Sequence, residues 1–500
     1  EATVDVEAGA ALDLRGKARI GKGGSVSLQA NSSTVTTDGS GRVQLGEGSR
    51  FSGRGQGSGA FSLGTGGRVR VGDADPTGAS LRLDPGLFGS GFAQYDINGH
   101  QGVAVADGAR LVAALPGLRL TQDAQMATDR ASALAAWDVP LYSADPSKGR
   151  VSQRAGASIS LRSDRNSVGG DLRVGKDALV AVDPGQTISL LGAGNIDVEG
   201  TLLAKGGRIV IDDVRPQNAL YAGQRTERTW RFAEGALLDA DADAISLPDP
   251  SGRLRGQVRA GGRIEIGGAL DWETAAFVDN RPPEAFVVVE RGARLQARGA
   301  SAELDIDGQG RVRVDSDGGQ IVLRSANALY LEGGMDAAAG GAGARGGTLG
   351  LAFGGSIHAR GASEEVLRAR AITLSQHSAP VQPLPAALEY GHAALSVEQL
   401  QAGGFDNLSV FGDIRAVGDV DLRLAQSLRI HGQGTSSLGM AVDAGPSSAL
   451  RLSAPYVRLA QARWGQLAGE NLQGTAAVAS AGPDDHALAV RAGQGNPGQF

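Results

Sequence analysis

The stretch Asn195–Asp212, NIDVEGTLLAKGGRIVID, decides the fold. Its apolar residues alternate with polar ones around two glycine turns, at Gly200 and at Gly206-Gly207. Alternation with a period of two between glycine turns is typical of short β-strands that bury one face. Strands this short do not make an independent sheet, so we expect them to stack on further copies of themselves.

Copies of the stretch recur along the chain. Each has two glycines, a polar residue, an apolar residue, any residue and an apolar residue. They lie at Gly23–Leu28, Gly66–Val71, Gly261–Ile266, Gly318–Leu323 and Gly346–Leu351. Glycine supplies the corners with positive φ that other residues avoid. Uneven self-similarity of this kind predicts a stacked solenoid, here an all-β parallel β-helix with coils about 4.8 Å apart.

The composition agrees with a thin core and many corners. Of 500 residues, 77 are Gly, and aromatic residues make up only 4%. There is no cysteine, which excludes disulfides, zinc ribbons and cysteine nucleophiles. The net charge is −6 and no basic block occurs, so we expect no nucleic-acid partner. No apolar run approaches the roughly 20 residues of a membrane span.

Changes in pattern divide the predicted solenoid into segments. We expect coils over 1–115, an insertion with a short helix over 116–150, coils over 151–375 with insertions near 214–235 and 272–284, a proline-rich linker and short helix over 376–400, coils over 401–468, and a polar, glycine-rich tail over 469–500. In the segment 376–400, Ser396-Val397-Glu398-Gln399 has the form of a capping box. The chain reads as one solenoid and an interior piece of a longer protein.

Most large aromatic residues fall in the insertions, which leaves two interpretations open. Insertions more often cover or cap an edge of a coil, but loops on a rigid scaffold also carry binding faces. Aromatic and arginine side chains are the usual anchors of an interface. The best candidates for a contact surface are Tyr221, Arg225, Arg228, Trp230, Arg231 and Phe232.

Several segments in a fixed order resemble a known family. They are GFAQYDINGHQG at 91–102, ASALAAWDVPLYSAD at 131–145, RAGASISL at 154–161, LYLEGGMDAAAGGAGARGGTLG at 329–350 and GGFDNLSVFGDI at 403–414. This series resembles the filamentous haemagglutinin-like large exoproteins of Gram-negative bacteria, over residues 85 to 460 approximately.

The resemblance implies a right-handed parallel β-helix and two-partner secretion through a dedicated outer-membrane pore. It implies a cell-surface or extracellular location and an adhesin-like role toward a host-cell surface or a glycan. The domain that engages the pore lies at the N-terminus of such proteins, and we do not find it in this sequence. The family offers no catalytic residues to carry over.

Motifs for cofactors and metals are incomplete, so we expect no cofactor and no metal. The stretch Gly16–Gly23 lacks the Ser or Thr and the helix of a phosphate loop, and a strand, not a helix, follows Gly341–Gly346. Asp239, Asp241 and Asp243 begin like a calcium loop, but Ala244 stands where the loop needs glycine. We interpret these three as a solvated acidic face.

The functional expectation is a rod-like adhesive exoprotein that is not an enzyme. Two alternatives remain. One is a passive stalk that presents a toxin or adhesive domain elsewhere in the parent protein. The other is a β-helix polysaccharide lyase or glycoside hydrolase, which needs carboxylates clustered on adjacent coils. Its candidates are Asp212, Asp213, Asp305, Asp307, Asp315, Asp317, Asp419 and Asp421.

Overall fold

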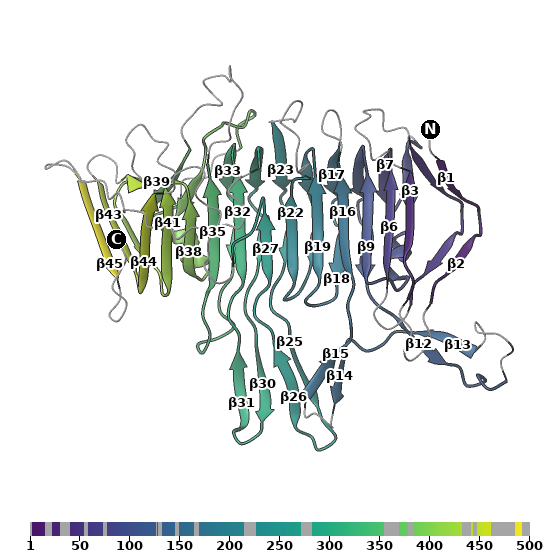
Figure 1. The fold of residues 1–500 in the computed structure, drawn as a ribbon. Helices are drawn as coiled ribbons and strands as arrows, with labels where there is room; N and C mark the ends of the chain where they lie inside the picture. The colour runs from purple at the N-terminus through teal and green to yellow at the C-terminus, as the bar shows by residue number, and fades with distance from the viewer. Residues whose placement is uncertain are drawn as a thin grey trace. The chain divides into compact units, whose positions relative to one another are not determined.

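Short parallel strands stacked rung on rung make up most of the computed structural model, and the predicted parallel β-helix is confirmed (Figure 1). The structure describes residues 3–15, 23–30, 41–54, 59–73, 78–126, 128, 133–145, 150–164, 170–214, 227–271, 283–354, 370–378, 384–432, 442–443, 448–461 and 486–492. They form two compact units. The first comprises residues 1–225, 235–259 and 301–314, and the second comprises 226–234, 260–300 and 315–500.

Three parallel sheets form the coils of the first unit. Sheet 1 contains β3 (Val26–Ala30), β6 (Ala60–Thr65), β9 (Gln94–Gly99), β16 (Ser158–Ser163), β19 (Thr187–Gly192) and β22 (Arg208–Asp212). Sheet 2 contains β8 (Ser80–Leu83), β7 (Arg68–Val71), β10 (Gly102–Val105), β17 (Asp171–Val174) and β20 (Ile196–Val198). Sheet 3 contains β11 (Arg110–Ala113), β18 (Leu179–Val182), β21 (Thr201–Leu203) and β24 (Leu237–Asp239).

The first coils have smaller elements of their own. Strand β1 (Thr3–Val6) pairs with β4 (Arg42–Leu45), β2 (Ala11–Asp13) pairs with β5 (Arg50–Ser52), and the 3-10 helix η1 spans Pro85–Gly89. Phe88 of η1 is buried against Tyr95, with ring centroids 5.3 Å apart. The Tyr95 hydroxyl accepts hydrogen bonds from the backbone of Gly91 and Phe92, at 3.1 and 3.2 Å. A large ring is therefore accommodated here because its polar end is bonded.

The second unit repeats the arrangement. Sheet 1 here contains β27 (Arg263–Ile266), β32 (Gln320–Ser325), β35 (Gly347–Phe353), β38 (Phe405–Phe411), β41 (Ser427–Gly432) and β44 (Tyr456–Gln461). Sheet 2 contains β23 (Arg228–Phe232), β28 (Ala285–Val289) and β33 (Ala328–Leu331), and sheet 3 contains β29 (Arg294–Gln296) and β34 (Gly334–Asp336). Two smaller sheets complete the unit. One contains β36 (Ala371–Ser375), β37 (Ala394–Ser396), β39 (Asp413–Val417) and β42 (Val442–Asp443). The other contains β40 (Val420–Arg423), β43 (Ser448–Ala454) and β45 (His486–Ala492).

The stretch Asn195–Asp212 is one complete coil, formed by β20, β21 and β22 in turn. Each strand pairs in parallel with the corresponding strand of the preceding coil, and Ile209 lies opposite Ile188. The side chains of Ile196, Leu202 and Ile209 are fully buried, as the alternation predicts. A narrow core of this kind is stabilised chiefly by the removal of small aliphatic side chains from water.

The Gly-Gly pairs mark the corner where the chain enters sheet 1. They precede β3, β22, β27, β32 and β35, whereas the copy before β7 enters sheet 2. The cause is close backbone stacking of adjacent coils. A Cβ at Gly207 would lie 2.1 Å from the carbonyl oxygen of Gln186, and one at Gly319 would lie 2.0 Å from that of Gly262. No side chain fits at either position.

Four antiparallel hairpins interrupt the sequence between a sheet 3 strand and the next sheet 1 strand. They are β12 (Gly117–Leu120) with β13 (Leu134–Trp137), β14 (Tyr142–Asp145) with β15 (Arg150–Gln153), β25 (Ala244–Pro248) with β26 (Leu254–Val258), and β30 (Ser301–Ile306) with β31 (Gly310–Asp315). Part of the helix predicted within 116–150 falls outside the described residues, and the described parts of that insertion form the first two hairpins. The coils predicted over 244–258 and 301–315 are wrong.

In the second unit, the described part of the predicted linker over 376–400 packs on a sheet. Leu384, Leu388 and Tyr390 lie against the outer face of β28 and β33. The capping box is confirmed: the Ser396 hydroxyl accepts from the Gln399 amide at 3.0 Å, and the Gln399 side chain accepts from the Ser396 amide at 3.0 Å. It opens helix α2 (Val397–Ala402). The tail over 469–500 lies outside the described residues, apart from β45.

Candidate functional site

The predicted contact surface is not exposed at two of its aromatic residues. Trp230 and Phe232 are fully buried, and Arg228 is 1% exposed. All three lie on β23 and face inward, because every second residue of a coil strand points into the core. This part of the prediction is wrong. The segment 214–235 is not one insertion, since its second half is a coil strand.

The remaining candidates differ in position. Arg231 points outward on β23 and its Nε donates to a carboxylate oxygen of Glu290 at 2.6 Å, with 42% of its side chain exposed. Tyr221 and Arg225 lie outside the described residues. The Arg228 guanidinium donates from Nε to the Glu284 carbonyl at 3.2 Å and lies 6.0 Å from the Trp230 ring. Among the candidates that the structure describes, no exposed aromatic–arginine cluster therefore forms at β23.

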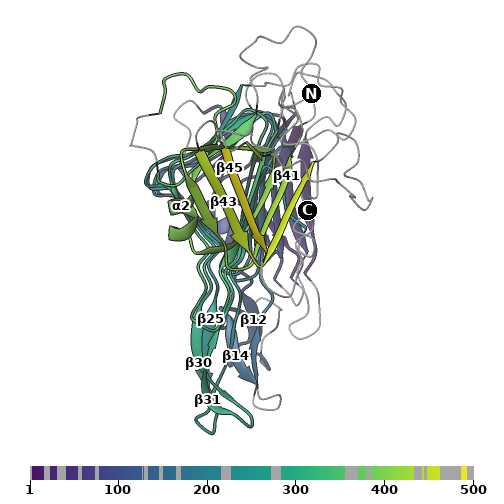
Figure 2. The same ribbon diagram turned by 90° about the vertical axis from the view of Figure 1, so that its left-hand side faces the viewer.

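A different feature stands out in the first unit. Hairpins β14–β15, β25–β26 and β30–β31 extend in one direction away from the coil strands, and both views show them grouped (Figures 1 and 2). We call these three hairpins the arm. Strand β26 lies against β30. The Leu254 amide donates to the Asp305 carboxylate at 2.6 Å, and the Arg255 guanidinium donates to the Asp305 carbonyl at 3.2 Å.

The turn of the β25–β26 hairpin is organised by one carboxylate. Asp249 accepts hydrogen bonds from the Ser251 amide at 2.8 Å, the Ser251 hydroxyl at 2.6 Å and the Arg253 amide at 3.0 Å. Arg255 adds an ion pair at 3.2 Å. Donors that favour the charged form, the Ser251 hydroxyl above all, lower the pKa of Asp249 to about 2. The turn is thus held by an anion at ordinary pH.

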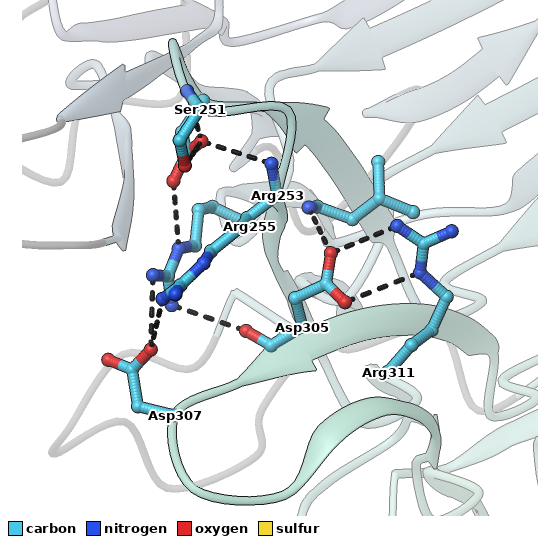
Figure 3. Close-up of polar contacts among 8 residues, drawn as sticks. Ser251, Arg253, Arg255, Asp305, Asp307 and Arg311 are labelled. Carbon is cyan, nitrogen blue, oxygen red and sulfur yellow. Dashed lines mark hydrogen bonds and ion pairs between the residues drawn. The ribbon is translucent and has the colours of Figure 1, made fainter.

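The neighbouring hairpin supplies the partners for a larger network (Figure 3). Asp305 pairs with Arg311 across β30 and β31 at 3.0 Å, and that guanidinium lowers the pKa of Asp305. Asp307 accepts from both Arg253 and Arg255, each at 3.1 Å. We call Asp249, Ser251, Arg253, Arg255, Asp305, Asp307 and Arg311 the tip network. It joins two hairpins through charged side chains, in addition to the contacts that the Leu254 amide and the Asp305 carbonyl make.

Part of the tip network is presented to solvent. The side chains of Asp307, Arg253 and Arg311 are 73, 59 and 53% exposed, whereas Arg255 and Asp249 are 12% exposed. The inner pair fixes the hairpin, and the outer three expose guanidinium and carboxylate groups to solvent. Arginine held in place by an ion pair retains donors that can bind a further carboxylate, phosphate or hydroxyl group.

The base of the arm is polar and largely paired. Arg154 binds Asp183 through two hydrogen bonds of 2.6 and 3.0 Å, and Lys205 lies 2.6 Å from Asp239. Asp239 and Asp241 are 8 and 7% exposed, so the predicted solvated acidic face is wrong. Lys205 also lies 3.7 Å from Asp241, which offsets part of the cost of burying these carboxylates.

Where β25 leaves the coil, Asp243 accepts a hydrogen bond from the Tyr142 hydroxyl of β14. Burial raises the pKa of this carboxyl group. The contact connects the first and second hairpins of the arm. The two ends of the arm therefore differ, with buried pairs at the base and exposed pairs at the tip.

Hairpin β12–β13 presents two large apolar side chains. Met126 in its turn region is 85% exposed and Leu120 of β12 is 63% exposed. Scattered exposed apolar side chains are normal on a protein surface. We therefore place the candidate site at the tip network.

The carboxylates considered for catalysis are engaged with amides and guanidinium groups. Asp315 and Asp317 accept from the amides of Gly343 and Arg345, at 3.1 and 2.8 Å, and so tie one corner to the next. Asp419 accepts from the Ala449 amide at 2.8 Å, and Asp421 pairs with Arg423 at 2.7 Å.

Asp305 and Asp307 belong to the tip network, and the Asp213 amide donates to Asp212 at 2.8 Å. Within the described ranges, no group of three His, Cys, Asp or Glu side chains is placed to hold a metal ion.

Comparison with known proteins gives no relatives. No family model, no curated protein and no solved structure matches the chain. Among the residues that the structure describes, no helix has the length and apolar character needed to cross a membrane.

Proposed function

We propose that this chain belongs to a secreted, surface-displayed exoprotein that acts in adhesion, and that the tip network is its contact element. The parent protein would leave the cell through a two-partner secretion pore and meet a host-cell surface or a glycan. The order of the segments quoted for the haemagglutinin-like family supports the secretion and the location. The tip network replaces the aromatic residues of β23 as the proposed contact surface.

The proposal rests on one observation: positively and negatively charged side chains at the end of the arm are exposed to solvent and are also held in position by ion pairs. Arg253 and Arg311 are more than half exposed, yet each is held by a carboxylate at 3.1 or 3.0 Å. A side chain that is ordered before binding loses less conformational entropy when a partner arrives. Two paired hairpins therefore provide a better contact element than a single free loop.

A binding and turnover assay tests the function. The purified chain is incubated with host cells and with neutral and acidic polysaccharides, and both bound protein and released sugar are measured. Saturable binding without product release supports adhesion. Product release would support a β-helix lyase or hydrolase instead, and neither binding nor release would leave the passive stalk.

A further inference from the structure

Strands β41 and β44 of the second unit place basic side chains on the outer face of sheet 1. Leu428 and Ile430 of β41 are fully buried, so the residues that alternate with them point away from the core. Arg429 lies opposite Arg458 in the parallel register, and His431 is the next outward residue along β41. Paired positions on neighbouring strands are about 4.8 Å apart. We call Arg429, Arg458 and His431 the basic cluster.

The Arg429 guanidinium is held in position by neutral groups. Its Nη1 donates to the Ser427 hydroxyl at 3.0 Å, and that hydroxyl donates to the side-chain oxygen of Asn407 at 2.7 Å. Its Cζ lies 5.0 Å from the centre of the Tyr456 ring, whose face attracts a cation. An arginine ordered in this way loses less conformational entropy when it binds a further group, and it retains N–H donors for that group.

Within the described part of the chain, no carboxylate pairs with Arg429 or His431. Burial and the charge of Arg458 lower the pKa of Arg429. Burial and the charges of both arginines lower the pKa of His431 to about 4, and this side chain is only 7% exposed. Like charges at opposite positions of neighbouring strands destabilise a sheet, and a charge removed from water needs a partner. A bound anion would offset both costs.

We propose that the basic cluster binds a phosphate group, with Arg429 and Arg458 donating to its oxygens and His431 donating a further hydrogen bond. The planar, forked donors of arginine match the oxygens of phosphate. Two cations in adjacent positions favour a doubly charged phosphate over a singly charged carboxylate. Inorganic phosphate and the phosphate monoester of a saccharide share this chemistry. The site lies in the second unit and is independent of the tip network.

Calorimetric titration of the whole chain tests the proposal. The ligands are inorganic phosphate and glucose 6-phosphate, with acetate as the singly charged comparison. The titrations are run at low ionic strength and about pH 7.5, where a phosphate monoester is mostly doubly charged. We expect saturable binding of phosphate, at least about tenfold tighter than that of acetate. The tighter of the two phosphates distinguishes the free ion from the sugar ester. No saturable binding of either phosphate, or acetate binding of equal affinity, would overturn the proposal.

Variants make the test specific to the basic cluster. Arg429→Gln should weaken phosphate binding at least about tenfold, because charge-assisted hydrogen bonds are lost. Arg423→Gln is the matched control: this exposed arginine already pairs with Asp421 at 2.7 Å, so its loss should leave the affinity unchanged. Arg429→Lys retains the charge but not the forked donors and should bind phosphate more weakly than the original chain. It decides the matter if Arg429→Gln does not fold. Unchanged affinity in a folded Arg429 variant, or an equal loss in Arg423→Gln, would contradict the assignment of the site.

Discussion

Trp230 and Arg231 are neighbours in sequence but face opposite sides of β23, which allows a matched test. Trp230→Ala leaves a cavity in the core and should reduce the free energy of unfolding by about 3–5 kcal/mol. Arg231→Ala removes a partly exposed ion pair and should cost less than about 1 kcal/mol. Urea denaturation followed by circular dichroism measures both. Equal losses would contradict the assignment of Trp230 to the core.

In several turns between sheets 2 and 3, one residue has positive φ. Examples are Gly108 with φ 68°, Asp177 with φ 57° and Gly292 with φ 84°. The following alanine amide closes each turn, for example Ala109 to Ala106 at 3.1 Å. Aspartate adopts this conformation more easily than alanine because its short polar side chain bonds locally.

Gly108 therefore offers a graded test of backbone strain. No atom lies within 4 Å of a Cβ placed there, so a substitution acts through φ and not through a clash. We expect Gly108→Ala to destabilise the chain by about 1–2 kcal/mol and Gly108→Asp to destabilise it less, as Asp177 implies. Thermal unfolding of the two variants gives the order. A less stable aspartate variant would refute this account of the turn.

The inward and outward faces of single residues were predictable wherever the alternation was recognised as a strand. Ile209 and Ile211 were assigned correctly on this basis. The prediction failed at Arg228, Trp230 and Phe232 because their residue types were given more weight than their positions. Trp230 and Phe232 are aromatic, and each of the three residues lies two positions from the next. This spacing is typical of side chains on the inward face of one strand.

At the scale of elements, period two does not distinguish a coil strand from a hairpin strand. Both β22 and β31 alternate, but β22 pairs in parallel with another coil and β31 pairs antiparallel within its own hairpin. The turn sequences carry the missing information. Asp249-Pro250-Ser251-Gly252 and Asp307-Gly308 are typical of tight turns between adjacent strands. The arm was predictable from these turns, whereas the pairing between its hairpins depends on contacts distant in sequence.

The β25–β26 turn should tolerate acid to an unusual degree. The folded pKa of Asp249 is about 2, below the unfolded value of 3.8. Its contribution to hairpin stability is complete above pH 3.8 and is lost as the pH falls through about 2. Exchange of the Arg253 amide, which donates to this carboxylate, reports the turn.

Ser251→Ala is the control for the cause of this tolerance. Its hydroxyl makes the largest contribution to the low pKa of Asp249. We expect the variant to lose protection of the Arg253 amide at a higher pH than the original chain. Identical acid profiles would show that the hydroxyl does not hold the turn.

At the scale of the whole molecule, fold and function were not equally accessible from the sequence. The fold class follows from a local pattern that recurs many times. A wrong assignment of one segment, such as a hairpin taken for a coil, therefore leaves the predicted fold class unchanged. The proposed contact element is formed from residues 249–255 and 305–311, which are separated by about 50 positions in the sequence. Their ion pairs arise only after the hairpins have packed, and no local pattern specifies that.

The adhesive role of the tip network is the central claim, and the binding of a tip variant tests it most directly. In the triple variant Arg253→Ser, Asp307→Ser and Arg311→Ser, the exposed charges are removed while Asp249 and Arg255 still hold the turn. The control is Arg110→Ser with Arg451→Ser, which changes two exposed arginines on coil strands. Binding to host cells is measured for both after circular dichroism confirms the fold. We predict at least a tenfold loss of affinity, about 1.4 kcal/mol, for the triple variant and none for the control; equal affinity of both variants and the original chain would contradict the claim.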